Sequence, residues 1–223
     1  MPDTPRRNAD LLIFDLDGTL IDSKLDLAHA VNATRGHMGF PPMEHDTVYS
    51  YVGNGAPVLI RRALGPPASD ADVQRGLDFF LAYYRDHMLD YTVLYPGVRE
   101  ALDRLLHAGV KMAVLTNKPV RISQAIVDGL GVGGHFQRVY GGNSFARKKP
   151  DPIGIETLLA DCSAARERTV MVGDSAVDIQ TARNAGVRSC GVTYGFQPET
   201  FLAEPPDLLV DRLDELVDWV VVY

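Results

Sequence analysis

The chain has 223 residues, which suffices for one large domain or for a core domain with a small inserted one. Aspartate and glutamate number 29 against 22 lysines and arginines, for a formal net charge of -7, and no segment gathers enough basic residues to follow a phosphate backbone. We therefore expect no nucleic acid partner. Cys162 and Cys190 are predicted to be inert thiols in a reducing compartment rather than a disulfide.

Neither end of the chain is predicted to be a membrane signal. Residues 1–10 contain Arg6 and Arg7 but no apolar segment typical of a secretion signal, and we expect a frayed start there. The apolar stretch at 217–223 is interrupted by Asp218 and is too short to span a bilayer. The sequence therefore predicts a cytoplasmic protein without a membrane partner.

The first predicted element is a short buried strand that ends in two aspartates. Residues 11–14 are all apolar, as in a central strand of a parallel sheet, and Asp15, Asp17 and Gly18 follow directly. Ligands of open α/β sheets bind at this end of the strands. If the period of two persists, both aspartates project to the same side, where their charges repel unless a cation or a proton relieves them.

The stretch 22–90 is predicted to be helical and to contain no strand. The spacing of its apolar residues predicts three helices, over 22–35, 54–64 and 70–89. Asp22 or Ser23 is expected to cap the first helix and Asn54 the second. Breaks rich in glycine and proline separate the helices.

From residue 95 onward, strands alternate with helices, which is typical of a parallel sheet covered on both faces. The predicted strands are 110–115, 138–140, 169–172, 187–193 and 208–210. The predicted helices are 98–107, 120–130, 151–160, 175–185 and 212–220. We therefore predict an α/β fold, with a doubly wound, Rossmann-like core formed by 1–21 and 91–223 and a small α-helical domain, 22–90, inserted into it.

Polar residues follow several strands of this core at the point where each strand ends. Asp15 and Asp17 follow the first strand, Thr116 and Asn117 the second, and Asp174 the strand near residue 170. Because the carboxyl ends of parallel strands meet at one edge of the sheet, these side chains are expected to converge. Converging carboxylates form a site for a hard divalent cation, most simply Mg2+, which binds a few carboxylates together with water and a substrate phosphate.

Three more residues complete the predicted site. Asp178 lies four residues after Asp174, so that both occupy one face of a helix. That helix begins at Ser175, and its N-terminus and the Thr116 hydroxyl offer hydrogen-bond donors to an anion. Lys149 adds a fixed positive charge. Together these residues predict a site for a metal ion and a phosphate group.

Four short motifs stand out along the chain. They are Asp-Leu-Asp-Gly-Thr-Leu at 15–20, Leu-Thr-Asn at 115–117, Lys-Lys-Pro-Asp-Pro at 148–152 and Gly-Asp-Ser-Ala-Val-Asp at 173–178. In this order and at these intervals they resemble the four motifs of the haloacid dehalogenase superfamily, in its phosphatase branch. The helical stretch lies where that superfamily carries an inserted cap domain, and 51–64 and 191–196 are similar to bacterial phosphoglycolate phosphatases.

The resemblance implies a role for each of five residues. Asp15 would attack phosphorus and form an aspartyl phosphate. Asp17 would protonate the leaving alkoxide and then deprotonate the hydrolytic water. Thr116, Asn117 and Lys149 would bind the oxygens of the transferred phosphoryl group.

The resemblance also implies how Mg2+ is held. Its ligands would be the side chains of Asp15 and Asp174 and the backbone carbonyl of Asp17. Asp178 would orient Lys149 or a metal-bound water, with Ser175 in a supporting place. Lys148 is the less favoured of the two adjacent lysines, because the lysine of the family directly precedes the proline.

The implied substrate is a small phosphate monoester, with 2-phosphoglycolate favoured. Arg62 or Arg61 is a candidate for binding the carboxylate of such an acid, since an arginine fork suits a carboxylate, and a solvated helix end is the alternative for both. Asn54 is a further candidate, besides its expected place as a helix cap. Pyrophosphatases, phosphatases of other small phosphorylated acids or sugars, phosphomutases and, last, a non-catalytic phosphate-binding protein are the alternative functions. A monomer or a homodimer is expected.

Overall fold

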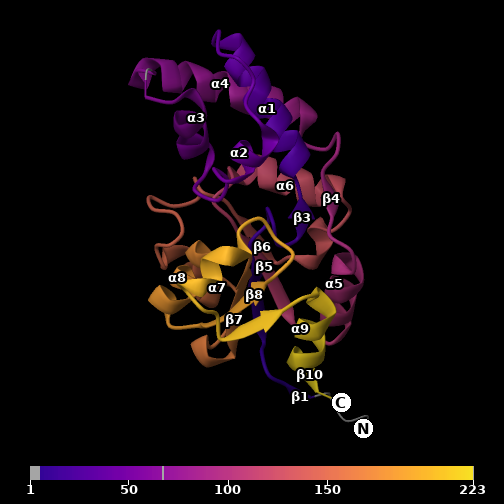
Figure 1. The fold of residues 1–223 in the computed structure, drawn as a ribbon. Coiled ribbons are helices and arrows are strands. Elements are labelled where there is room, and N and C mark those ends of the chain that lie inside the picture. Colours follow the sequence, from indigo (N-terminus) through magenta and orange to yellow (C-terminus); the bar gives the residue numbers. More distant parts are fainter. Residues whose placement is uncertain (1–5, 67, 223) are drawn as a thin grey trace.

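The computed structural model describes residues 6–66 and 68–222. Its centre is a six-stranded parallel sheet with the order β6-β5-β2-β7-β8-β9 (Figure 1). These strands are β2 (Leu11–Phe14), β5 (Lys111–Leu115), β6 (Arg138–Tyr140), β7 (Thr169–Gly173), β8 (Arg188–Val192) and β9 (Leu208–Val210). The helices that cover the sheet are α5 (Val98–His107), α6 (Val120–Gly129), α7 (Ile153–Asp161), α8 (Ala176–Ala185) and α9 (Leu213–Val220).

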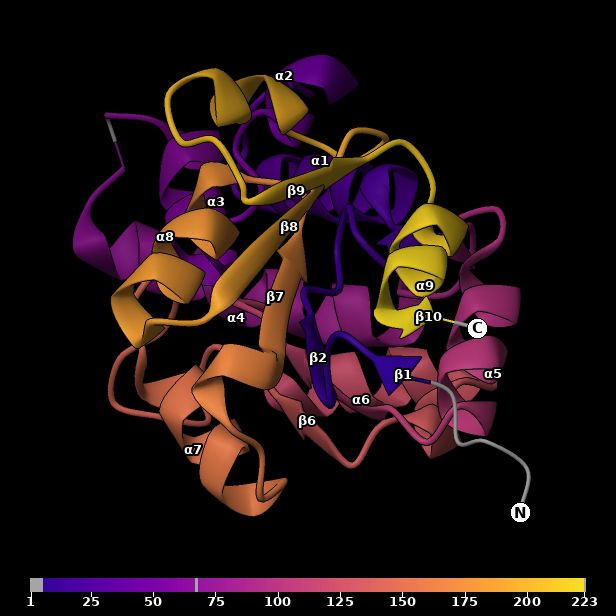
Figure 2. The ribbon, with the colours of Figure 1, turned by 90° about the horizontal axis from the view of Figure 1, so that it is seen from below.

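The central strand β2 supplies apolar side chains to both faces of the sheet. Leu11 and Ile13 belong to an apolar cluster with α7 and α8, whereas Leu12 and Phe14 belong to a second cluster with α5, α6 and α9. Figure 2 shows α7 and α8 on one side of the sheet and α5 and α9 on the other. All four side chains are completely buried, as expected of a parallel strand with helices on both of its faces. The predicted doubly wound α/β fold is therefore confirmed.

Each strand and helix predicted for the core is present, with bounds that differ by at most two residues. The start of the chain was predicted wrongly, because β1 (Arg6–Arg7) pairs antiparallel with β10 (Val221–Val222). The pairing is anchored by the Asn8 side chain, which donates to the Trp219 carbonyl at 2.7 Å. Residues 1–5 of the predicted frayed start lie outside the described residues. Both cysteines are buried and free, as predicted.

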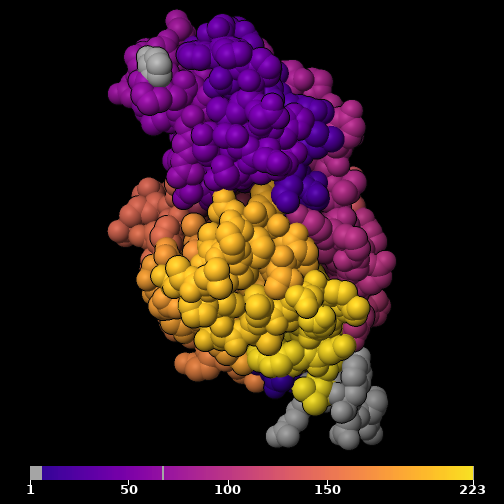
Figure 3. All heavy atoms as spheres, in the orientation of Figure 1, coloured from indigo at the N-terminus to yellow at the C-terminus, as the bar shows by residue number. Residues whose placement is uncertain are grey.

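Four helices, α1 (Lys24–His37), α2 (His45–Tyr49), α3 (Ala56–Leu64) and α4 (Asp70–His87), lie together over the carboxyl ends of the strands (Figures 1 and 3). Two segments connect them to the sheet, β3 (Ile21–Asp22) and β4 (Val93–Leu94), and these pair antiparallel with each other. Helix α2 was not predicted, since five residues are too few to show a helical period. Among the helices of the described residues, none is long and apolar enough to cross a membrane.

Of the two predicted helix caps, that of α3 is wrong and that of α1 is confirmed in its position. The N-cap of α3 is Gly55, at φ +82°, and not Asn54, because the chain turns into the helix through the left-handed region that glycine favours. Ser23 is the N-cap of α1 but makes no capping hydrogen bond, since its hydroxyl donates to Asp17 Oδ1 at 2.5 Å. The backbone N–H of Lys24 donates instead to Asp22 Oδ1, at 3.1 Å.

Asp26 fastens the start of α1 to the segment that returns to the sheet. Its carboxylate is 2 % exposed and accepts from the backbone N–H of Tyr91 (3.1 Å) and from the N–H and hydroxyl of Thr92 (2.8 and 2.7 Å). Asp26→Ala would leave these buried donors without a partner, so we expect it to lower the free energy of unfolding by about 3 kcal/mol in urea titrations. Asp86→Ala, on the exposed face of α4, is the control and should change it by less than about 0.5 kcal/mol. Equal effects of the two changes would contradict this role of Asp26.

Candidate active site

A cavity that is open to solvent lies between the carboxyl ends of the central strands and the helices α1, α3 and α4 above them. The chain continues from β2 to β5 and β6 on one side and reaches β7, β8 and β9 on the other, so that strand order reverses at β2. Ligands of open α/β sheets bind at this place. The lining residues from the sheet side include Asp15, Asp17, Thr116, Asn117, Lys118, Asp174 and Ser175, and those from the upper helices include Leu27, Leu59, Phe80 and Tyr84.

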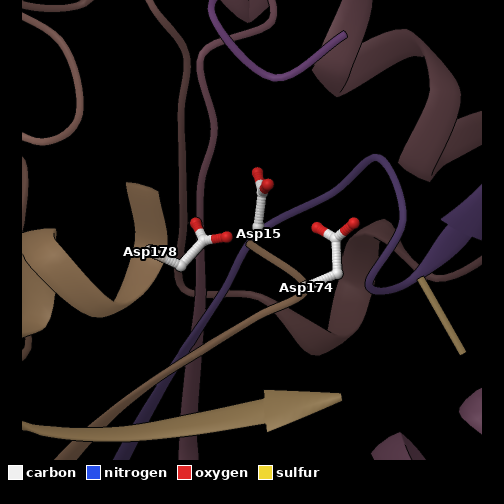
Figure 4. A group of neighbouring side chains, drawn as sticks. All are labelled: Asp15, Asp174 and Asp178. Carbon is white, nitrogen blue, oxygen red and sulfur yellow. The ribbon is translucent and has the colours of Figure 1, made fainter. Parts of the chain in front are cut away.

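Three buried aspartates converge beside this cavity. Asp15 follows β2, Asp174 follows β7 and Asp178 lies in the first turn of α8, and Figure 4 shows Asp15 between the other two. One carboxylate oxygen of each lies within 4.8 Å of those of the others. The structure thus brings together two of the three predicted metal ligands, Asp15 and Asp174, with the predicted supporting residue Asp178.

Lys149 lies between two of these carboxylates and is 5 % exposed. Its Nζ is 2.9 Å from Asp15 Oδ1 and 2.6 Å from Asp178 Oδ1. The other oxygen of Asp178 accepts from the N–H and hydroxyl of Ser175, at 3.2 and 2.9 Å. Both oxygens of Asp178 are therefore engaged, and this residue holds Lys149 and the first turn of α8 in place.

The carboxylates of the group are more numerous than the cations that neutralise them. Burial raises the pKa of Asp15 to about 6, with Lys149 opposing the rise and Asp178 adding to it. Burial and the charges of Asp178 and Asp15 raise the pKa of Asp174 well above its ordinary value. Such shifts show that the ionised forms lack compensating charge in the protein alone.

The residues at this place fit a divalent cation. Asp15 Oδ1 is buried and, among the described residues, forms no well-oriented hydrogen bond, although Lys149 Nζ lies 2.9 Å from it as an ion pair. An orphaned carboxylate oxygen next to a second carboxylate, that of Asp174, is the donor set that Mg2+ prefers. The predicted third ligand is a backbone carbonyl, that of Asp17, and it follows directly in the same loop.

Two glycines make room for Asp174. Gly18, at φ +83°, has no space for a side chain, since a Cβ there would lie 2.2 Å from Asp174 Oδ2. A Cβ on Gly195 would lie 2.2 Å from Asp174 Cβ, and the next N–H, that of Phe196, donates to Asp174 Oδ2 at 2.7 Å. Gly195 and Phe196 were not predicted as site residues, although the motif at 191–196 contained the signal.

Asp17 was predicted to crowd against Asp15, but its carboxylate is bound by other partners. Its carboxylate accepts from Ser23 Oγ at 2.5 Å and from Lys118 Nζ at 2.9 and 3.1 Å. The period of two does not continue through the two aspartates, because β2 ends at Phe14 and the chain bends at Leu16, between them. Each of the two aspartates is therefore paired with a lysine of its own.

Lys118 is a further site residue that was not predicted from the sequence. It is 6 % exposed, and its Nζ also donates to the hydroxyl of Tyr84, on α4, at 2.8 Å. Burial alone would lower the pKa of Lys118, but Asp17 and Tyr84 raise it above its ordinary value. A signal was present, since this lysine directly follows Thr116 and Asn117 at the end of β5.

Thr116 and Asn117 both line the cavity and are both buried. The Thr116 hydroxyl accepts from the backbone N–H of Lys118 at 3.3 Å, which leaves its own hydrogen for another acceptor. The Asn117 amide donates to the carbonyls of Gly53 (3.0 Å) and Lys149 (3.2 Å). Asn117 therefore joins the upper helical part to the core, a contact that the sequence did not predict.

The three residues predicted to bind substrate from the helical part lie elsewhere. Arg61 and Arg62 are exposed, since α3 turns its apolar residues inward and its arginines outward. Arg61 pairs with Asp70 at 2.6 Å, and the Arg62 guanidinium lies over the Tyr51 ring at 5.9 Å. The Asn54 carbonyl accepts from Lys148. Within the described part of the chain, the cavity lining includes none of the three, and the positions of the two arginines match a solvated helix end.

Comparisons with known proteins agree with this geometry. The family model described as Haloacid dehalogenase-like hydrolase matches residues 12–192. A phosphoglycolate phosphatase of Vibrio parahaemolyticus is 40% identical over 219 residues, covering 95% of this chain and 96% of that protein. A phosphoglycolate phosphatase of Pseudomonas putida is 42% identical over 214 residues, covering 93% and 78%.

Among solved structures, that of a predicted phosphoglycolate phosphatase from Haemophilus somnus superimposes with a TM-score of 0.89 at 30% identity, covering 95% of this chain and 97% of that one. The chain belongs to the haloacid dehalogenase-like hydrolase family. It is an enzyme of the phosphoric monoester hydrolase class.

Proposed function

We propose that the protein is a Mg2+-dependent phosphatase that hydrolyses 2-phosphoglycolate to glycolate and phosphate. The observation that carries this proposal is the buried Asp15 at the cavity, next to Asp174 and 2.9 Å from the ammonium of Lys149. The likeness to proteins named phosphoglycolate phosphatase supports the choice of substrate.

In the proposed reaction, Asp15 attacks the phosphorus, and the bond from phosphorus to the ester oxygen breaks. The leaving alkoxide takes a proton from Asp17, and the phosphoryl group stays on Asp15 as an aspartyl phosphate. Asp17 then removes a proton from a water that attacks phosphorus, the bond between phosphorus and Asp15 breaks, and phosphate is released, which returns Asp15 to its carboxylate and Asp17 to its protonated form. Thr116 and Lys149 would donate to the phosphoryl oxygens.

The Asp15 and Asp174 side chains and the Asp17 carbonyl would hold Mg2+. When bound, this ion would neutralise the charge that otherwise repels an anionic phosphate from an anionic nucleophile. Lys149 contributes a second, permanent positive charge beside Asp15. Asp178 and Ser175 would keep that ammonium directed at the cavity.

We also propose that 1–21 and 91–223 form a catalytic core and 22–90 a cap. The two short strands β3 and β4 would be the links between them. The cap side of the cavity is largely apolar, with Leu27, Leu59 and Phe80. An apolar cover excludes water from the site, which strengthens the electrostatic interactions within it.

The test is release of inorganic phosphate, with Mg2+ and with a chelator, across 2-phosphoglycolate, pyrophosphate, hexose phosphates and other small phosphorylated acids. We expect activity that the chelator removes and that Mg2+ restores. We also expect a specificity constant for 2-phosphoglycolate 10- to 100-fold above the others, about 1.4 kcal/mol for each tenfold step.

A preference for pyrophosphate would contradict the proposed substrate while leaving the phosphatase chemistry. Full activity in chelator, after exhaustive removal of metal, would contradict the dependence on Mg2+. Phosphate release from no substrate would favour the mutase or the binding protein.

A further inference from the structure

We propose that Lys118 is the positioning residue for Asp17 and that Tyr84, on α4, holds Lys118 in place. The inference rests on the acid and base role proposed for Asp17. The contact between α4 and the core would then take part in the reaction. Tyr84 on α4 would fix Lys118, and Lys118 would align the carboxylate of Asp17 that transfers the proton.

The hydrogen bonds of Lys118 are directed at these two partners. An ammonium group has three N–H donors, and here they meet Asp17 Oδ1 at 2.9 Å, Asp17 Oδ2 at 3.1 Å and the Tyr84 hydroxyl at 2.8 Å. The Lys118 side chain is 5 % exposed and that of Asp17 is 13 % exposed. A buried charge pair of this kind keeps its geometry because water competes poorly for either group.

The two oxygens of Asp17 differ in how firmly they are held. Oδ1 accepts from both Ser23 and Lys118, whereas Oδ2, as far as the chain is described, accepts from Lys118 alone and at the longer distance. Oδ2 is therefore the oxygen free to meet an ester oxygen or a water. A general acid must come within hydrogen-bond reach of the atom to which it gives its proton, so fixing Oδ1 fixes where Oδ2 can act.

Tyr84 lies on the buried face of α4. It is 1 % exposed, and its ring stacks on that of Phe80 with centroids 5.5 Å apart. Lys118 Nζ lies 4.5 Å from the centroid of the Tyr84 ring, within the range of a cation–π contact. The hydroxyl and the ring of Tyr84 thus both fix the ammonium, and α4 has to lie against the core for them to do so.

Leaving groups that differ in their need for a proton provide the test. An alkoxide leaves only if it is protonated, whereas p-nitrophenolate leaves without a proton. In single-turnover experiments, Lys118→Met should slow release of the alcohol from 2-phosphoglycolate and from 2-hydroxyethyl phosphate by about 100-fold, and release of p-nitrophenol by less than about fivefold. Lys118→Arg, which keeps the charge, should restore most of the loss on the alkyl esters.

Tyr84→Phe removes one hydroxyl and tests the second step separately. It should show the same selectivity in smaller measure, about five- to tenfold on the alkyl esters, and it serves as the decisive variant if Lys118→Met does not fold. Lys148→Met is the matched control, because the ammonium of Lys148 donates to the Asn54 carbonyl in the helical part instead of to Asp17. Its losses should not depend on the leaving group.

Equal losses on the alkyl and aryl esters would show a structural role and overturn the inference. A rise in KM confined to 2-phosphoglycolate, absent for 2-hydroxyethyl phosphate, which has no carboxylate, would assign Lys118 to the substrate carboxylate and overturn the inference too. If the wild type hydrolyses all esters at similar rates, only the proposed substrate is contradicted, and a selective loss in the variants still supports the inference. A wild type without any phosphatase activity overturns both, since Asp17 then has no proton to transfer.

Discussion

Replacement of Asp15 by asparagine is expected to reduce phosphate release by roughly 10⁴-fold or more, because a neutral amide does not supply the nucleophile. The fold should survive, since the amide has nearly the shape of the carboxylate. The variant also removes one of three buried negative charges that lie within 4.8 Å of one another. Activity and stability are therefore expected to move in opposite directions, which distinguishes a lost nucleophile from a misfolded site.

The expected gain in stability follows from the raised pKa of Asp15. Burial raises it from 3.8 to about 6 in the folded protein. An acid with a raised pKa in the folded state loses its favourable contribution as the pH rises from the ordinary pKa through the folded one. At neutral pH the ionised Asp15 thus destabilises the metal-free protein, and Asp15→Asn should melt at the same temperature as the wild type or above it.

Asp10→Asn is the control, an identical substitution at the other end of β2. Asp10 pairs with Arg168 at 2.5 Å, and a hydrogen bond from Arg168 holds the pKa of Asp10 below its ordinary value. This change should lower the free energy of unfolding by up to about 1 kcal/mol and leave turnover within about twofold. Appreciable phosphate release by pure Asp15→Asn would overturn the nucleophile, and a melting temperature well below that of wild type would show a structural defect instead.

Lys149→Met is expected to lower turnover by about 10²- to 10³-fold, the loss typical of one fixed donor to the reacting group. Without Lys149, the carboxylates of Asp15 and Asp178 lose the cation that lies 2.9 and 2.6 Å away. The metal-free variant should therefore be less stable than wild type, and Mg2+ should raise its melting temperature more than it raises that of wild type. Steady-state kinetics and thermal unfolding at several Mg2+ concentrations measure both effects.

Lys148→Met is the matched control for Lys149→Met. The two lysines are adjacent in sequence, but Lys148 is half-buried and contacts the Asn54 carbonyl rather than a carboxylate. Its loss should cost less than about tenfold in activity and should leave the response to Mg2+ unchanged. A larger loss for Lys148→Met than for Lys149→Met would reverse the roles assigned to the pair.

The adjacent lysines illustrate what can be predicted from sequence. The motif favoured Lys149 because it directly precedes Pro150, and the structure places Lys149 between two carboxylates and Lys148 against a loop of the helical part. Core strands and helices were predicted to within two residues, since a parallel strand buried on both faces and an amphipathic helix each leave a local apolar pattern. The five-residue helix α2 left no such pattern.

Residues that meet across long separations could not be predicted in this way. Lys118 follows the motif of β5 but meets Asp17, 101 residues earlier, and Tyr84, 34 residues earlier. Arg61 and Arg62 suited a carboxylate by chemistry, yet α3 turns them to solvent, because its apolar residues decide which face is buried. Residue type identified possible partners, while the orientation of the helix selected among them.

The sequence by itself determined the order of strands and helices, the strand ends at which Asp15, Thr116 and Asp174 converge, and the place of the helical insertion. These features follow from the local spacing of apolar residues and from the rule that ligands bind at the carboxyl ends of parallel strands. Only the tertiary structure decided that Lys118 holds Asp17, that Asn117 joins the helical part to the core, and which residues of that part face the cavity. Such contacts depend on how α3 and α4 pack over the sheet, which no single segment of the chain encodes.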